Sequence, residues 1–313
     1  MTKTIPIIDI SPLLKGEVAL VAQEIGAACR GIGFFYITGH GLKSGLREEL
    51  FRTAHNFFAL SDETKRKVLY SATTGNRGYV PMKGEALDPA KPADLKEAFN
   101  IGLEMPQDHP EIIAKVPFRA PNLWPELPGF RETTLTYFSE VWTIGRLLHR
   151  AFAADLGITQ NYFEGKFDRP LATLRLLHYP PRPADIEPGQ MGAGAHTDYG
   201  CVTLLATDEV GGLEVQTRDG TWLQAPYIAG ALICNIGDCL MRWTNDIYVS
   251  TPHRVVNPAG RERYSVAFFL DPNPDAVVAS LPGLPGPAKY PAITGADYLR
   301  SRLDATYKPQ SLL

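Results

Sequence analysis

The second half of the chain carries a series of short apolar segments separated by turn residues, and this series limits the folds open to it. From residue 172 onward there are eight such segments: TLRLLHY, HTDYGCVTLLA, GLEVQT, TWLQAP, ALICNI, CLMRWT, TPHRVV and RYSVAFFL. They are rich in β-branched and aromatic residues, and turn signals such as RDG at 218–220 lie between them. About eight short antiparallel strands predict a jelly roll or closed barrel, the double-stranded β-helix of cupin-like proteins.

The first half of the chain differs because its apolar residues follow helical spacing. The predicted helices lie at 17–31, 44–60, 61–67 and 135–156, with Ser61 as an N-cap, and predicted strands lie at 33–41 and near Phe99–Leu103. Pro and Gly are frequent at 75–128, which predicts mostly loop there. These segments predict an α+β fold in which a helical region packs on the β core.

We expect a single domain over residues 1–313, because the sequence contains no clear linker, internal repeat or low-complexity tract. Within it we expect a mainly helical N-terminal region at 1–170 and a jelly-roll core at 171–271 that holds the functional site. Residues 272–313 would form a C-terminal segment. The oligomeric state is not readable from the sequence.

Composition and charge exclude several classes of protein. The 31 Lys and Arg residues against 34 Asp and Glu residues give a net charge of −3, which provides no electrostatic footprint for nucleic acid. The N-terminus lacks the features of a signal peptide, and no apolar stretch approaches the ~20 residues of a membrane span. The four cysteines follow no metal-binding or disulfide pattern and are expected to be free thiols. We therefore expect a cytoplasmic protein without nucleic-acid or membrane partners.

Polar residues interrupt the apolar pattern at GAHTDYG, where His196 and Asp198 are two residues apart. On a regular strand they would point to the same face, and His253 lies on another predicted strand of the same β region. Two imidazoles and one carboxylate form the facial triad of non-haem Fe(II) oxygenases, which leaves coordination positions open for other ligands. Taken alone this spacing is a weak signal, and a hydrogen-bonded surface histidine is the structural alternative.

A second polar pair follows the last histidine of this set by ten residues. Arg263 and Ser265 would share one face of the strand RYSVAFFL. An inward Arg is unfavourable in an apolar strand unless an anion meets it, and its planar fork fits a carboxylate. The alternative places Arg263 outward and Tyr264, Val266 and Phe268 inward, and the strand's apolar residues on both faces leave this choice open.

Together these motifs resemble those of iron(II)/2-oxoglutarate-dependent dioxygenases of the isopenicillin N synthase-like family. HTD, HRV and RYS match the family's iron ligands and its RxS carboxylate clamp, and LLHYPP resembles the segment whose tyrosine, here Tyr179, contacts the co-substrate. The resemblance runs nearly end to end, from IPIIDIS and GFFYITGHG to YVSTPHRVV. Two departures are Leu177, where many plant members carry Asn, and Asp246, where glycine is usual.

The resemblance implies an enzyme that binds Fe(II) through His196, Asp198 and His253 and 2-oxoglutarate through Arg263, Ser265 and Tyr179. It implies that O₂ and 2-oxoglutarate are consumed, that succinate and CO₂ are released, and that a small organic substrate is oxidised, with hydroxylation as the default outcome. Ascorbate is expected to act as a stimulant. Desaturation, epoxidation and ring formation use the same chemistry, and the substrate cannot be read from the sequence.

Two other functions stay open at this point. Some relatives keep the iron and the fold but do not use 2-oxoglutarate, and a non-catalytic barrel could bind a small ligand in the same pocket. Release of succinate separates the first of these from the 2-oxoglutarate enzyme. A non-catalytic relative would be expected to have lost part of the triad, whereas all three ligand types are present here.

Overall fold

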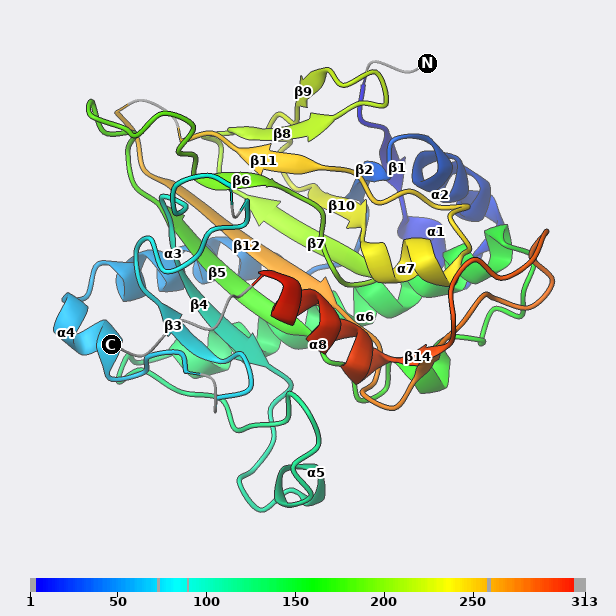
Figure 1. The fold of residues 1–313 in the computed structure, drawn as a ribbon, viewed down its shortest axis with the longest axis horizontal. Coiled ribbons are helices and arrows are strands. Elements are labelled where there is room, and N and C mark those ends of the chain that lie inside the picture. The colour runs from blue at the N-terminus through cyan, green and yellow to red at the C-terminus, as the bar shows by residue number, and fades with distance from the viewer. Residues whose placement is uncertain (1–3, 72–73, 89, 258–259, 307–313) are drawn as a thin grey trace.

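The computed structural model describes residues 4–71, 74–88, 90–257 and 260–306. Within them, two sheets face each other, and helices cover the outer side of the larger one (Figure 1). The predicted α+β class with a jelly-roll core, the double-stranded β-helix, is confirmed. Residues after 306, at the end of the predicted C-terminal segment, lie outside the described ranges.

The larger sheet has eight strands and the smaller sheet four. The order in the larger sheet is β1 (Ile7–Asp9), β2 (Phe34–Thr38), β10 (Leu232–Ile236), β7 (Val202–Thr207), β12 (Arg263–Leu270), β5 (Thr173–Tyr179), β4 (Glu97–Gly102) and β3 (Gly78–Val80). The order in the smaller sheet is β6 (Ala193–His196), β11 (His253–Val255), β8 (Leu213–Gln216) and β9 (Trp222–Gln224). β1 pairs with β2 in parallel, and the other pairs of both sheets are antiparallel.

The first half contains six described helices; those at 19–31, 46–58, 62–66 and 130–155 match predicted helices, whereas those at 11–14 and 110–113 were not predicted. The six are α1 (Ser11–Leu14), α2 (Ala19–Gly31), α3 (Leu46–Phe58), α4 (Asp62–Arg66), α5 (Pro110–Ile113) and α6 (Phe130–Asp155). Ser61 caps α4 as predicted, since its hydroxyl accepts a hydrogen bond from the Thr64 backbone N–H. The helix α6 packs against α2 and α3 and against the larger sheet at β7 and β12. It therefore forms the outer wall of the main hydrophobic core.

The strand β12 divides the protein's interior because its two faces have different surroundings. Val266, Phe268 and Leu270 point into the core beneath α6, where the rings of Phe268 and Phe138 meet edge to face at 5.0 Å. The alternate residues point toward the smaller sheet and line a cavity between the sheets. One strand thus anchors the sheet to its helices and forms part of the cavity wall.

The segment CLMRWT was predicted as a strand, and this is wrong. It forms the helix α7 (Asp238–Trp243), in which Cys239, Leu240 and Trp243 are buried. A short apolar run carries no periodicity that separates strand from helix. The acidic Asp238 in the first turn favours a helix there because it complements the positive end of the helix dipole.

The segment HTDYGCVTLLA was predicted as one continuous strand, which is also wrong. The chain leaves the smaller sheet after His196 and enters the larger sheet at Val202. The intervening turn is held by α7, because the backbone N–H groups of Asp238 and Cys239 donate to the carbonyls of Asp198 and Tyr199 at 2.8 and 3.0 Å. The turn carries the chain from one sheet to the other.

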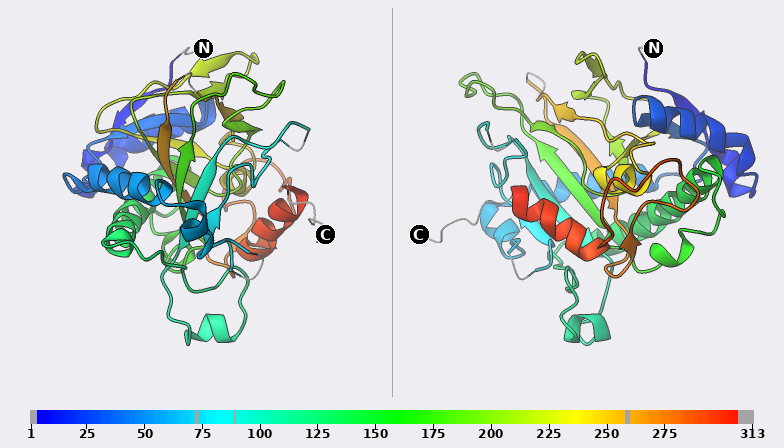
Figure 2. Two further views of the ribbon diagram at one scale, coloured as in Figure 1. Left: turned by 90° about the vertical axis from the view of Figure 1, so that its left-hand side faces the viewer. Right: turned by 45° about the vertical axis from the view of Figure 1, so that its right-hand side comes forward.

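The N-terminal half also contributes to the larger sheet, through β1, β2, β3 and β4. The loop-rich stretch contains the strand predicted near 99–103, observed as β4, and the short helix α5, which projects from the body of the molecule in both views of Figure 2. After β12 come the short pair β13 (Val277–Val278) and β14 (Ile293–Thr294) and the helix α8 (Gly295–Thr306). Among the described helices, none is both long and apolar enough to cross a membrane.

Candidate active site

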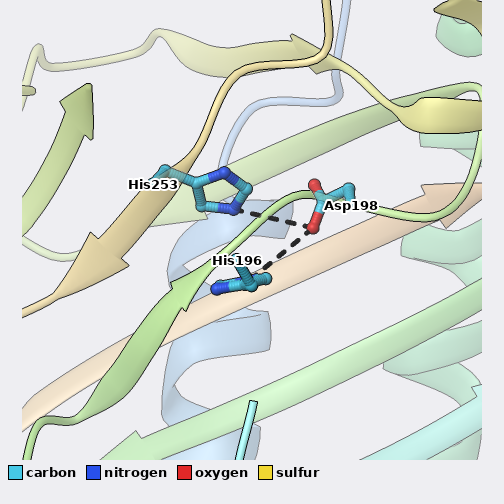
Figure 3. Close-up of side chains that lie close together, drawn as sticks. All are labelled: His196, Asp198 and His253. Carbon is cyan, nitrogen blue, oxygen red and sulfur yellow. Dashed lines mark ion pairs between the residues drawn. The ribbon is translucent and has the colours of Figure 1, made fainter. Parts of the chain in front are cut away.

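Three predicted ligand residues converge at the inner side of the two sheets (Figure 3). The strands β6 and β11 pair so that His253 lies directly opposite His196, and the ring centroids are 4.3 Å apart. Asp198 reaches them from the turn after β6, with Oδ1 at 3.8 Å from His196 Nε2 and 3.6 Å from His253 Nε2. One ligand atom from each residue lies within 4.8 Å of the others, which is close enough to share one metal ion. The prediction that these residues meet is confirmed, although the turn brings Asp198 into place rather than a shared strand.

Backbone carbonyls orient both imidazoles. His196 Nδ1 lies 2.7 Å from the Gly194 carbonyl, and His253 Nδ1 lies 3.1 Å from the Thr251 carbonyl. A carbonyl can only accept, so Nδ1 carries the proton on both rings and Nε2 presents its lone pair to the shared centre. This arrangement is typical of metal-binding histidines.

The charges of the three side chains suit a cation. Burial and the neighbouring His253 lower the pKa of His196 to about 3, so its imidazole is neutral at pH 7. Burial opposes ionisation of Asp198, but the two histidines hold its pKa well below the ordinary value. Burial favours neutral His253, yet the Asp198 carboxylate raises its pKa above the ordinary value. A bound divalent ion would place positive charge next to the Asp198 carboxylate.

Two buried donors fix the Asp198 carboxylate. Thr203 Oγ1 and Asn235 Nδ2 donate to Oδ2 at 2.5 and 2.7 Å, which leaves Oδ1 facing the histidines. Thr203 is the second residue of the largely buried strand β7, and Asn235 is the polar member of the apolar strand ALICNI. Sequence reasoning missed Asn235, although a polar residue inside a buried strand was a usable signal.

Thr203→Val keeps the shape of the side chain and removes its donor, so Asp198 should be held less firmly. We expect the Kd for Fe(II) to rise about 10–100-fold, the range typical for losing such an outer hydrogen bond. Competition with a coloured chelator measures this Kd. Thr207→Val, on the same strand, should leave the affinity as it is, and equal affinities for both variants would show that Thr203 does not position the carboxylate.

The second predicted cluster lies along β12 and β5. Arg263 and Ser265 are each 1% exposed, so the inward orientation is observed and the outward alternative is excluded. Arg263 Nε donates to the Gly211 carbonyl at 2.6 Å, Nη1 donates to Ser265 Oγ at 3.2 Å, and the guanidinium lies 4.6 Å from the centre of the Tyr179 ring. Within the described part of the chain, no carboxylate lies within ion-pair distance of Arg263. A buried guanidinium without an acidic partner fits an anionic ligand.

Both clusters line one cavity of about 170 Å³. Its walls also include Leu177, Leu299 and Leu303, the last two from α8. In Figure 1, α8 lies in red beside the strands of the larger sheet. Arg302 of the same helix binds Asp238 at 2.8 Å, and the same carboxylate oxygen accepts from Thr197 in the turn that bears Asp198. The C-terminal helix is therefore tied directly to the turn that carries the candidate ligand.

The other histidines lie elsewhere, as their positions in the sequence indicate. His149 is buried in the core with Nδ1 at 2.8 Å from the Gly145 carbonyl, and His178 binds Glu97 at 2.7 Å on the face of β5 away from the cavity. All four cysteines are in described segments, and each is a buried free thiol as predicted. Asp246 stands where glycine is usual and adopts a positive φ of 66°, a conformation that favours glycine. This departure from the family pattern affects a turn remote from the triad.

The chain matches two family models. Residues 5–127 match the N-terminal region of non-haem dioxygenases, described for morphine synthesis, and residues 170–272 match the 2OG-Fe(II) oxygenase superfamily. The second match contains the three candidate ligands and the Arg263 cluster. Both sheets of the fold are therefore represented in the matched regions.

Relatives cover nearly the whole chain. The 2-oxoglutarate-Fe(II) type oxidoreductase hxnY of Emericella nidulans is 38% identical over 96% of this chain and 90% of that protein. A homoarginine-6-hydroxylase of Oryza sativa subsp. japonica is 38% identical, over 88% of each. A probable iron/ascorbate oxidoreductase of Dictyostelium discoideum is 37% identical, over 90% of this chain and 84% of that protein.

A solved structure agrees with the fold. The crystal structure of a full-length Neurospora crassa protein in complex with alpha-KG and thymine superposes with a TM-score of 0.85 at 36% identity, and 97% of each chain is covered. The family models, the full-length relatives and the fold all agree with the convergent His-Asp-His set, and together they assign the family. The chain belongs to the 2OG-Fe(II) oxygenase superfamily, in its isopenicillin N synthase-like branch, and is a non-haem Fe(II)- and 2-oxoglutarate-dependent oxygenase.

Proposed function

We propose that the protein hydroxylates a small organic substrate with Fe(II) bound by His196, Asp198 and His253. The overall reaction consumes one O₂ and one 2-oxoglutarate and releases succinate and CO₂, one oxygen atom entering succinate and the other the substrate. The iron, when bound, supplies the activation of O₂ that no side chain can provide. One observation supports this most strongly: a three-ligand set and a buried arginine without an acidic partner share one cavity.

In this proposal the protein's residues position the co-substrate. Arg263 and Ser265 bind the C5 carboxylate of 2-oxoglutarate, and the Tyr179 ring packs against the guanidinium. His196, Asp198 and His253 would hold Fe(II) through three ligand atoms, which would leave coordination positions open to the co-substrate and O₂. The charges then cancel, because Fe(II) and Arg263 together balance Asp198 and the two carboxylates of 2-oxoglutarate. Such cancellation is what a buried site requires.

Hydroxylation is the proposed outcome because it is the default of this chemistry, and one relative is named as a hydroxylase. Small molecules are the proposed substrates, in keeping with the thymine bound in the Neurospora structure. Ascorbate is proposed as a stimulant that keeps the iron reduced, as the name of the Dictyostelium relative suggests. We further propose that residues 1–313 act as one domain, since the cavity draws on both the core and α8.

The reaction is tested by incubating the purified protein with Fe(II), 2-oxoglutarate and a metabolite pool. We expect substrate-dependent succinate and a product heavier by one oxygen atom in the mass spectrum. Substrate oxidation with O₂ uptake but without 2-oxoglutarate would favour the alternative, an iron oxidase that does not use 2-oxoglutarate. A complete lack of turnover with intact metal binding would contradict catalysis.

A further inference from the structure

One face of β12 follows the cavity from end to end. Arg263, Ser265, Ala267, Phe269 and, just after the strand, Asp271 all line it. At about 3.3 Å per residue, the Cα atoms of the first and last are roughly 26 Å apart. The cavity lining therefore carries a cation, Arg263, at one end of β12 (its cationic end) and an anion, Asp271, at the other (its anionic end).

The candidate metal centre lies nearer the anionic end. Asp198 is held by Thr203, and Thr203 pairs in register with Phe269 on β12. A Cβ added to Gly200, in the turn that bears Asp198, would lie 2.8 Å from Asp271 Oδ1. Since 2-oxoglutarate extends from the metal toward Arg263 in the proposed function, the space beside Asp271 is left for the substrate.

The other charged side chains lining the cavity have partners. Arg175 binds Glu85 at 2.5 Å, and Lys96 binds Asp94 at 2.6 Å. Asp271 is 6% exposed, and within the described ranges neither an ion pair nor a hydrogen-bond donor is found for its carboxylate. Burial, assisted by the charge of Asp198, raises the pKa of Asp271 to about 7, which reflects how little the protein compensates this carboxylate.

We infer that Asp271 is the substrate-recognition residue and that it binds a positively charged nitrogen group of the substrate: an ammonium, amidinium or guanidinium. An acidic side chain buried without a partner is unfavourable, and a cation with N–H donors meets both its charge and its lone pairs. The inference rests on the proposed function, because 2-oxoglutarate must occupy the Arg263 end. It adds a substrate class to that function.

The test uses pairs of small molecules of matched chain length, one member cationic and the other neutral. Alkylguanidinium and alkylammonium ions of graded length are each compared with the neutral alcohol of the same length. Calorimetry measures their Kd for enzyme loaded with Fe(II) and 2-oxoglutarate without oxygen. We expect the cations of fitting length to bind at least about tenfold more tightly than their neutral partners, and Asp271→Asn to remove this preference.

Two further variants show whether the charge itself matters. Asp271→Glu keeps the carboxylate and should retain a preference for cations, whereas Asp304→Asn removes an exposed charge on α8 and should leave all Kd values unchanged. Equal binding of cations and neutral partners by the native enzyme would overturn the inference, whether or not Asp271→Asn folds. A cation preference that persists in a folded Asp271→Asn protein would also overturn it. Substrate-dependent succinate formed by the native enzyme with the metabolite pool, in the absence of these probes, tests the proposed function separately.

Discussion

His253→Ala should lose iron binding and substrate-dependent succinate formation, with turnover below about one hundredth of the native rate. The substitution removes one of three ligands, a larger change than the loss of an outer hydrogen bond, which typically costs 10–100-fold. It also removes the neighbour whose charge lowers the pKa of Asp198, so that carboxylate should be protonated over a wider range of acidic pH. Iron content by metal analysis and succinate by mass spectrometry measure the two effects.

His55→Ala is the matched control for this variant. His55 lies on α3 with its ring 5.5 Å from that of Tyr264, outside the cavity, so its loss should leave iron content and turnover near native values. Native activity in His253→Ala would remove this residue from the ligand set. If His253→Ala binds iron at native stoichiometry but shows no turnover, His253 would instead act in a step after metal binding.

Arg263→Lys should raise the KM for 2-oxoglutarate about 10–100-fold and change kcat at saturating co-substrate much less. Lysine keeps the positive charge but lacks the planar fork, so it cannot bind a carboxylate through two parallel hydrogen bonds. It also loses the Nε–H that binds the Gly211 carbonyl and fixes the side chain. The loss of one charge-assisted hydrogen bond, about 1.5–3 kcal/mol, corresponds to this range.

Arg261→Lys provides the comparison, because Arg261 is exposed, lies two residues earlier and pairs with Glu209 at the surface. Its KM should equal that of the native enzyme. Succinate formation measured against 2-oxoglutarate concentration gives both constants. An unchanged KM in Arg263→Lys would mean that the C5 carboxylate binds elsewhere in the cavity.

The local patterns of the sequence were sufficient for most elements. Apolar spacing predicted α2, α3 and α6, and alternation with turn residues predicted β5, β8, β10, β11 and β12. The prediction failed for CLMRWT and for the HTDYG segment. In both places the backbone conformation depends on packing between distant segments, since α7 and the turn at Asp198 hold each other through backbone hydrogen bonds.

In the candidate site too, the sequence predicted some features, and others depended on packing between distant segments. Residue chemistry identified the two histidines, the aspartate and the RxS pair, because few other combinations suit a metal and a carboxylate. The orientation of Arg263 stayed open in the sequence, since its strand is apolar on both faces. The position of α6 settled it, because Phe268 and its neighbours fill the core beneath that helix and turn Arg263 toward the cavity. Asn235 and Asp271 gained roles only through their neighbours in space.

By itself, then, the sequence determined the types of donor, the class of fold and the order of most of its elements. The tertiary structure decided that His253 pairs opposite His196 and that Asp198 meets them from a turn. It also decided that the cavity has a cationic and an anionic end. The physical reason is range: backbone propensity and side-chain periodicity act over a few residues, whereas strand register across 57 positions, from 196 to 253, is set by how the whole core packs.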